Sequence, residues 1–226
     1  MTSKIQPAGV LFDVDGTLVD STYLHTVAWW AALRQFEHDV PMAEIHRGIG
    51  MGADMILDHL LGDDRDSDAD EALTAAHDVL YGAWWERLRP LPGAADLLRA
   101  CAKRGLAIVL ASSAKDRELA ILRRIVDADD VITAATSSSD AAQSKPAPDI
   151  LEAALERSGV DPNRSVFVGD AVWDVQAAGK LGIPCIGLAS GGTSAAELRE
   201  AGAVAVYDDP AALLEALESS PIATLH

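Results

Sequence analysis

The chain has 226 residues, of which 49% are hydrophobic and 23% charged, and this composition is typical of a globular protein with one or two domains. Its formal net charge of −17 argues against a nucleic acid or an anionic membrane as partner, because both attract basic surfaces. No apolar run approaches the roughly 20 residues of a membrane-spanning helix, and the polar N-terminus does not resemble a secretory signal, so we expect a cytoplasmic protein.

The first part of the chain combines one strand with a long helical region. Residues 9–14 form an apolar run that ends in acidic residues and glycine, which is typical of a buried strand entering a loop. Apolar residues then recur at helical spacing over 20–36, 53–61 and 70–88, and Asp20 or Ser21 could cap the first of these helices. Residues 28–89 contain no convincing strand. We interpret them as part of an all-helical insertion.

After Pro90, Pro92 and Gly93 the pattern changes to strands that alternate with helices. The expected strands cover residues 106–111, 131–133, 165–168, 183–187 and 203–207. The expected helices cover residues 94–103, 116–125, 148–158, 172–181, 194–201 and 210–217. This alternation predicts an α/β fold with a Rossmann-like parallel sheet that helices cover on both faces. We predict a core domain of residues 1–19 and 90–226 and a helical domain of residues 20–89, called the cap below.

Polar residues follow the predicted strands directly. In a parallel sheet, ligands bind beyond the carboxyl ends of the strands. Neighbouring carboxylates repel one another unless a cation neutralises them, and their hard oxygen atoms favour Mg²⁺. Hydroxyls, a lysine and helix N-terminal amides suit a phosphate group. The residues at these positions are Asp13, Asp15, Gly16, Thr17, Ser112, Ser113, Lys145, Asp170 and Asp174.

The first of these loops carries two aspartates with different expected tasks. Asp13, at the strand end, can attack phosphorus as a nucleophile and form an aspartyl phosphate. Asp15 can protonate the leaving oxygen and then activate water. A dianionic phosphate repels a carboxylate, so Mg²⁺ and Lys145 must offset charge before Asp13 approaches. Gly16 permits the sharp turn, and Thr17 offers a hydroxyl and an amide.

Residues 12–21, FDVDGTLVDS, resemble the first motif of the haloacid dehalogenase superfamily. The strand ending in Ser112, the pair Lys145–Pro146 and residues 169–174, GDAVWD, resemble the second, third and fourth motifs in order and spacing. The cap resembles that of the β-phosphoglucomutase and phosphoglycolate phosphatase branch. The resemblance covers nearly the whole chain and implies a Mg²⁺-dependent enzyme that acts on a small phosphate ester.

The resemblance also implies a role for each matching residue. Asp13 would be the nucleophile and Asp15 the general acid and base. Ser112, helped by the backbone of Ser113, would bind the phosphoryl group, and Lys145 would neutralise it.

The same resemblance implies a metal site. Mg²⁺ would be held by the side chain of Asp13, the backbone carbonyl of Asp15 and Asp170. Asp174 would act through water or by orienting Lys145.

Within the family, the sequence favours a phosphatase. Dehalogenases lack the second aspartate, which is present here as Asp15, and no lysine between residues 17 and 89 could form the Schiff base of a phosphonoacetaldehyde hydrolase. A sugar phosphomutase is the alternative, but Met51 aligns with the cap arginine that grips its second phosphate. Arg47, earlier in that segment, is the other candidate cation. A non-catalytic binding protein is less consistent with the complete set of chemical groups.

Other features of the cap and core lead to smaller expectations. His25 aligns with a histidine at the cap hinge of β-phosphoglucomutase, and we expect a hinge or core residue. Residues 48–52 should form a glycine-rich loop over the site, and the tryptophan pairs at 29–30 and 84–85 should pack against each other. The two cysteines, Cys101 and Cys185, should be buried thiols. The expected substrates are sugar phosphates or phosphoglycolate, and the expected assembly is a monomer or homodimer.

Overall fold

The computed structural model describes residues 6–62 and 65–225, so Lys4 and most of the polar N-terminal segment lie outside the described part. Six parallel strands form one sheet in the order β3-β2-β1-β4-β5-β6. These strands are β1 (Gly9–Phe12), β2 (Ala107–Ala111), β3 (Ile132–Thr136), β4 (Ser165–Gly169), β5 (Cys185–Leu188) and β6 (Ala205–Tyr207). The α/β fold with a Rossmann-like parallel sheet is therefore confirmed. The first strand of the chain lies at its centre, between β2 and β4.

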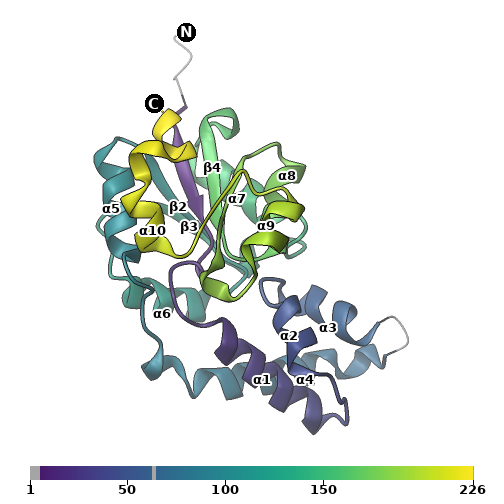
Figure 1. Cartoon of the computed structure of the whole chain (residues 1–226). Coiled ribbons are helices and arrows are strands. Elements are labelled where there is room, and N and C mark those ends of the chain that lie inside the picture. The colour runs from purple at the N-terminus through teal and green to yellow at the C-terminus, as the bar shows by residue number, and fades with distance from the viewer. Residues whose placement is uncertain (1–5, 63–64, 226) are drawn as a thin grey trace.

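Helices cover both faces of this sheet (Figure 1). One face carries α5 (Ala94–Lys103), α6 (Asp116–Val126) and α10 (Pro210–Glu215), and the other carries α7 (Asp149–Ser158), α8 (Val172–Lys180) and α9 (Ala195–Ala201). Along β1, Val10 and Phe12 join the first core while Leu11 joins the second, because successive side chains of a strand alternate between faces. All four residues of β1 are buried, as is usual when both faces are covered.

The cap consists of α1 (Thr22–Gln35), α2 (Met42–Gly48), α3 (Ala53–Leu61) and α4 (Asp70–Gly82). It lies at one end of the sheet, and the start of β1 and the short C-terminal helical turns lie at the opposite end (Figure 1). The cap has its own apolar core, which includes Trp29, Leu33, Ile45, Ile56 and Leu73. The two chain segments that connect the cap to the core lie side by side. The N–H of Asp20 in the first donates to the carbonyl of Arg89 in the second at 3.0 Å. Within the described residues, no helix is both long enough and apolar enough to cross a membrane.

The tryptophan pairs do not pack as predicted. Trp29 stacks on His77 with 4.1 Å between ring centroids. The others lie under guanidinium groups, in the pairs Trp30–Arg34, Trp84–Arg87 and Trp85–Arg117. Consecutive residues of a helix point about 100° apart, so adjacent indoles on a helix face different surroundings. Both cysteines are buried and free, as expected.

Candidate active site

The strand order brings distant segments of the chain to one edge of the sheet. Asp13 follows β1, Ser112 follows β2 and Asp170 follows β4, and β2 and β4 are the two neighbours of β1. The N–H of Asp13 extends the ladder by donating to the carbonyl of Val168 at 2.9 Å. That bond determines where the Asp13 side chain leaves the sheet. The loop before α7 adds Lys145, so the predicted strand-end residues do meet.

Lys145 is completely buried between two carboxylates. Its Nζ donates to Asp13 Oδ1 and, at 2.8 Å, to Asp174 Oδ1. Burial disfavours an ammonium group, but the charges and hydrogen bonds of Asp13 and Asp174 outweigh that effect and raise the pKa of Lys145. Lys145 is therefore charged at neutral pH, directly beside the proposed nucleophile.

Asp13 is itself 5% exposed and carries a strongly shifted pKa. Burial raises its pKa to about 7, the negative charges of Asp174 and Asp15 add to that effect, and Lys145 offsets only part of it. A second cation in contact with Asp13 would favour the ionised carboxylate that a nucleophile requires.

Asp174 is buried and contacts both the loop that follows β4 and Lys145. Its Oδ2 accepts the N–H groups of Asp170 at 3.1 Å and Ala171 at 3.0 Å, while its Oδ1 accepts from Lys145. This geometry supports the predicted orienting role. Asp170 is held from its other side by Thr17, whose hydroxyl donates to Asp170 Oδ1 at 2.9 Å.

Three buried carboxylates form a group that fits a hard cation. Ligand oxygens of Asp13, Asp170 and Asp174 all lie within 4.8 Å of one another. Burial raises the pKa of Asp170 well above its usual value, and the charges of Asp174 and Asp13 raise it further. Lys145 therefore offsets only part of the repulsion among these carboxylates, and their oxygen donors suit Mg²⁺. The side chains of Asp13 and Asp170 lie together in this group, and their role as ligands, like that of the Asp15 carbonyl, stays a prediction.

Gly191 makes room for the Asp170 carboxylate. A Cβ atom at position 191 would lie 1.6 Å from Asp170 Oδ2, so an alanine requires the carboxylate to move. We expect Gly191→Ala to weaken Mg²⁺ binding about 10- to 100-fold, as displacement of a supporting group does at other metal sites, and titration calorimetry would measure this. Gly179→Ala is the matched control, because nothing lies within 4 Å of that position. Equal Mg²⁺ affinities for the two variants would contradict this account.

Asp15 lies on the wall of the pocket against the cap hinge. Its Oδ1 accepts the Ser21 hydroxyl at 2.5 Å and lies 3.3 Å from His25 Nε2, which is also 3.3 Å from Glu118 Oε1. Burial acts to raise the pKa of Asp15, but the hydrogen bonds of His25 and Ser21 lower it overall. Conversely, burial acts to lower the pKa of His25, but Asp15 and Glu118 raise it to about 10. His25 is therefore an imidazolium in contact with the predicted general acid, which is more than a hinge or core role.

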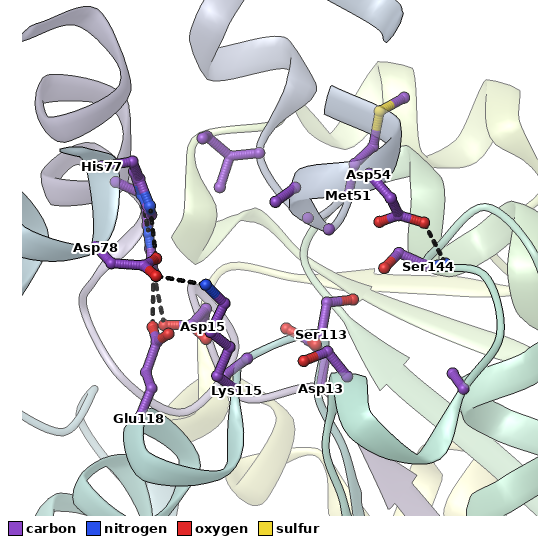
Figure 2. Close-up of a pocket in the computed structure, with 18 of the residues that line it drawn as sticks. Asp13, Asp15, Met51, Asp54, His77, Asp78, Ser113, Lys115, Glu118 and Ser144 are labelled. Atoms are coloured by element: carbon purple, nitrogen blue, oxygen red, sulfur yellow. Dashed lines mark hydrogen bonds and ion pairs between the residues drawn. The ribbon is translucent and has the colours of Figure 1, made fainter. Parts of the chain in front are cut away.

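The contacts of His25 continue into the cap. As an imidazolium it donates from Nδ1 to His77 Nε2 at 3.2 Å, and His77 donates from Nδ1 to Asp78 Oδ1 at 3.3 Å. Burial lowers the pKa of His77 to about 4, so His77 is neutral and can accept that bond. Asp78 also pairs with Lys115, which precedes α6 (Figure 2). These contacts join α4 of the cap to the core beside Asp15.

Two serines provide hydroxyls at the end of β2. The Ser112 hydroxyl is buried and accepts the N–H of Ala114 at 3.0 Å. The Ser113 hydroxyl is a buried atom without a hydrogen-bond partner among the described residues, and Ser113 lines the pocket next to Asp13 (Figure 2). Buried hydroxyls normally have a partner, and a phosphate oxygen would be one. We predicted a role only for the backbone of Ser113, but its side chain is also placed to bind a ligand.

The pocket has a volume of about 260 Å³ and lies between core and cap. Gly50, Met51 and Gly52 of the glycine-rich segment line it, so this segment does reach over the site as predicted. Arg47 does not, because its guanidinium pairs with Glu197 at 2.7 Å outside the pocket lining.

Sequence reasoning missed four of the charged or titratable groups around Asp15 and Asp13. Glu118 could have been found, because it lies in the first turn of the helix that follows Ser112 and Ser113. His77, Asp78 and Asp54 belong to cap helices, where no motif or spacing relates them to the strand ends.

Comparisons with known proteins agree with this geometry. A family model described as haloacid dehalogenase-like hydrolase matches residues 7–182. A phosphoglycolate phosphatase of Rhodospirillum rubrum is 32% identical over 221 residues, covering 92% of this chain and 89% of the relative. One from Escherichia coli is 33% identical over 205 residues, covering 81% of each chain.

Solved structures give the same result. The crystal structure of a hydrolase from Pseudomonas syringae matches with a TM-score of 0.89 and 33% identity, covering 94% of this chain and 98% of that one. A β-phosphoglucomutase from Clostridium difficile has the same fold, with a TM-score of 0.80 at 18% identity over 94% of this chain and 96% of that one. The family model and these matches confirm the resemblance. The chain belongs to the haloacid dehalogenase-like hydrolase family.

Proposed function

We propose that this hydrolase is a Mg²⁺-dependent phosphatase of small phosphorylated metabolites, of the sugar phosphate or phosphoglycolate class. The observation that carries the proposal is the buried contact of Lys145 with Asp13, which shares its pocket with the Asp15 carboxylate. A nucleophile, a fixed cation and a second carboxylate are the groups that phosphoryl transfer to an aspartate requires. The phosphoglycolate phosphatases among the relatives support the same class.

In the first half-reaction, the hydroxyls of Ser112 and Ser113 position the phosphoryl group while Lys145 offsets its charge. Asp13 attacks phosphorus, the bond to the leaving alcohol breaks, and the phosphoryl group remains on Asp13 as an aspartyl phosphate. Asp15 gives a proton to the departing oxygen. Its low pKa in the free protein rises when a dianionic phosphate enters the pocket, because like charges favour the protonated acid.

In the second half-reaction, Asp15 takes a proton from water as that water attacks phosphorus. The Asp13–phosphate bond breaks, and inorganic phosphate leaves. Mg²⁺, held by Asp13, Asp170 and the Asp15 carbonyl, would supply positive charge against the phosphate oxygens. Asp174 orients Lys145, and closure of the cap over the pocket limits the entry of bulk water.

The phosphomutase alternative lacks a group it needs. Met51 lines the pocket where a cation would have to grip a second phosphate, and Arg47 is paired with Glu197 elsewhere. These positions favour hydrolysis over return of the phosphoryl group to a phosphorylated sugar.

A panel of small phosphate esters, assayed with Mg²⁺ and with a chelator, tests the proposal. We expect release of inorganic phosphate with Mg²⁺ and loss of at least about 99% of it on chelation, because the carboxylate group then lacks its counter-charge. β-Glucose 1-phosphate with a bisphosphate primer separates the alternatives, since isomerised sugar phosphate indicates a mutase. Absence of turnover across the panel would favour a non-catalytic binding protein.

A further inference from the structure

The part of the pocket that faces the leaving group is bordered by acidic side chains. Asp54 of α3, Asp78 of α4 and Glu118 of α6 all line it, beyond the position of Asp13 (Figure 2). Two of these three come from the cap, so the alcohol part of a substrate would meet them when the cap covers the site.

Each cation near this region already has an acidic partner. Lys115 pairs with Asp78, and the imidazolium of His25 lies between Asp15 and Glu118. Lys145 lies behind Asp13 and is fully buried. Within the described residues of the pocket lining, no cationic side chain remains without a carboxylate beside it.

Asp54 has acceptor capacity to spare and carries no ion pair, whereas Glu118, whose buried Oε1 also lacks a hydrogen bond, is paired with His25. Its Oδ2 accepts the backbone N–H of Ser144 at 3.1 Å, a contact that joins cap to core at the pocket (Figure 2). Its Oδ1 makes no hydrogen bond or ion pair with the other described residues. An ionised carboxylate can accept several hydrogen bonds, so Asp54 can bind a hydroxyl or an ammonium group of a ligand.

We propose that Asp54 selects phosphate esters whose alcohol part is neutral or cationic and carries hydroxyl or ammonium donors. An ester with a second anionic group would bring that group into an acidic lobe that has no unpaired cation. It would lie beside the exposed carboxylate of Asp54 without gaining a cationic partner, and like-charge contact disfavours it. The inference rests on the proposed phosphatase and narrows its substrate class away from carboxylate-bearing esters such as phosphoglycolate.

Three esters of similar size and different leaving-group charge test this inference. O-phosphoethanolamine is cationic in its alcohol part, glycerol 3-phosphate is neutral and 2-phosphoglycolate is anionic. With Mg²⁺ present, we expect kcat/KM for 2-phosphoglycolate to be at least about tenfold below that for glycerol 3-phosphate. We expect Asp54→Asn to reduce this ratio about fivefold to tenfold by removing the repelling charge.

Asp58→Asn is the matched control for that variant. Asp58 lies one turn further along α3, is exposed like Asp54, and pairs with Arg65 at 2.5 Å outside the pocket lining, so the net charge changes equally. It should leave the ratio unchanged. Preference for 2-phosphoglycolate in the unaltered protein, or equal ratios for the two variants, would overturn the inference.

p-Nitrophenyl phosphate distinguishes failure of the inference from failure of the proposed function. If the protein hydrolyses this activated ester and prefers 2-phosphoglycolate among the three esters, the proposed phosphatase activity is supported and the role of Asp54 is refuted. If the folded protein hydrolyses none of the esters, the phosphatase proposal fails. Calorimetric binding of the three esters then decides the charge preference, and equal or tighter binding of 2-phosphoglycolate refutes it.

Discussion

Asp13→Asn is expected to lower turnover of any phosphate ester by at least about 10⁴-fold while the protein stays folded. The amide is nearly isosteric and can still accept a hydrogen bond from Lys145, but it cannot form an acyl phosphate at a useful rate. Burial already raises the pKa of Asp13 to about 7, so loss of its negative charge costs the fold little. Steady-state release of phosphate and the thermal unfolding midpoint are the two measurements.

Asp20→Asn provides the control for this variant. Asp20 follows Asp13 in the same loop and is exposed, so the same change of chemistry occurs outside the pocket lining. It should retain turnover within about twofold, as expected for a surface substitution. Unimpaired hydrolysis by Asp13→Asn would show that Asp13 is not the nucleophile. A protein that no longer unfolds cooperatively would instead indicate a structural role.

Lys145→Met is expected to impair both stability and activity. Removal of one partner from a buried ion pair leaves uncompensated charge, which costs about 3–5 kcal/mol of unfolding free energy. Asp13 and Asp174 would then face each other without the ammonium that both contact. Loss of the charge beside the phosphoryl group should lower kcat/KM by at least about 10³-fold. Denaturant unfolding and phosphatase kinetics measure the two effects.

A double variant separates these two consequences. Adding Asp13→Asn to Lys145→Met removes one of the stranded charges, so we expect at least about 1 kcal/mol of the lost stability to return while activity stays absent. Lys103→Met, on the exposed last turn of α5, should change unfolding free energy by no more than about 0.5 kcal/mol. Additive effects of the two pocket substitutions would show that Lys145 and Asp13 are not coupled.

Much of the core could be predicted because its patterns are local. The limits of α3 and α5 agree with prediction, since their apolar spacing and flanking glycines are unambiguous. The helix predicted over 70–88 ends at Gly82, followed by a short 3₁₀ turn at Trp85–Arg87. The seven-residue helix α2 escaped prediction, because so short a segment carries no clear period. The domain limits at 19–20 and 89–90 stay a prediction, and the paired backbone of Asp20 and Arg89 is consistent with them.

The strand-end half of the site was also predictable, and the cap half was not. Asp13, Lys145 and Asp170 follow from strand order and motif spacing, since parallel strands end at one edge. Asp54 and His77 reach the pocket only because α3 and α4 pack over the core at a particular angle, which non-local contacts determine. Ser21 was a predicted cap of the first cap helix, but its hydroxyl donates to Asp15 and makes no capping bond to α1. This contact between different segments was likewise not predictable from local spacing.

The central position of β1 has a consequence for the newly made chain. Asp13 emerges from the ribosome early, but β4, which bonds to it, and Asp170, which Thr17 contacts across 153 positions of sequence, emerge much later. Contacts between such distant positions form late in folding, after long loops have closed. A partly synthesised chain therefore carries the proposed nucleophile without the groups that surround it in the folded protein. The site can be complete only after the segment through Asp174 has been synthesised and β4 has joined β1.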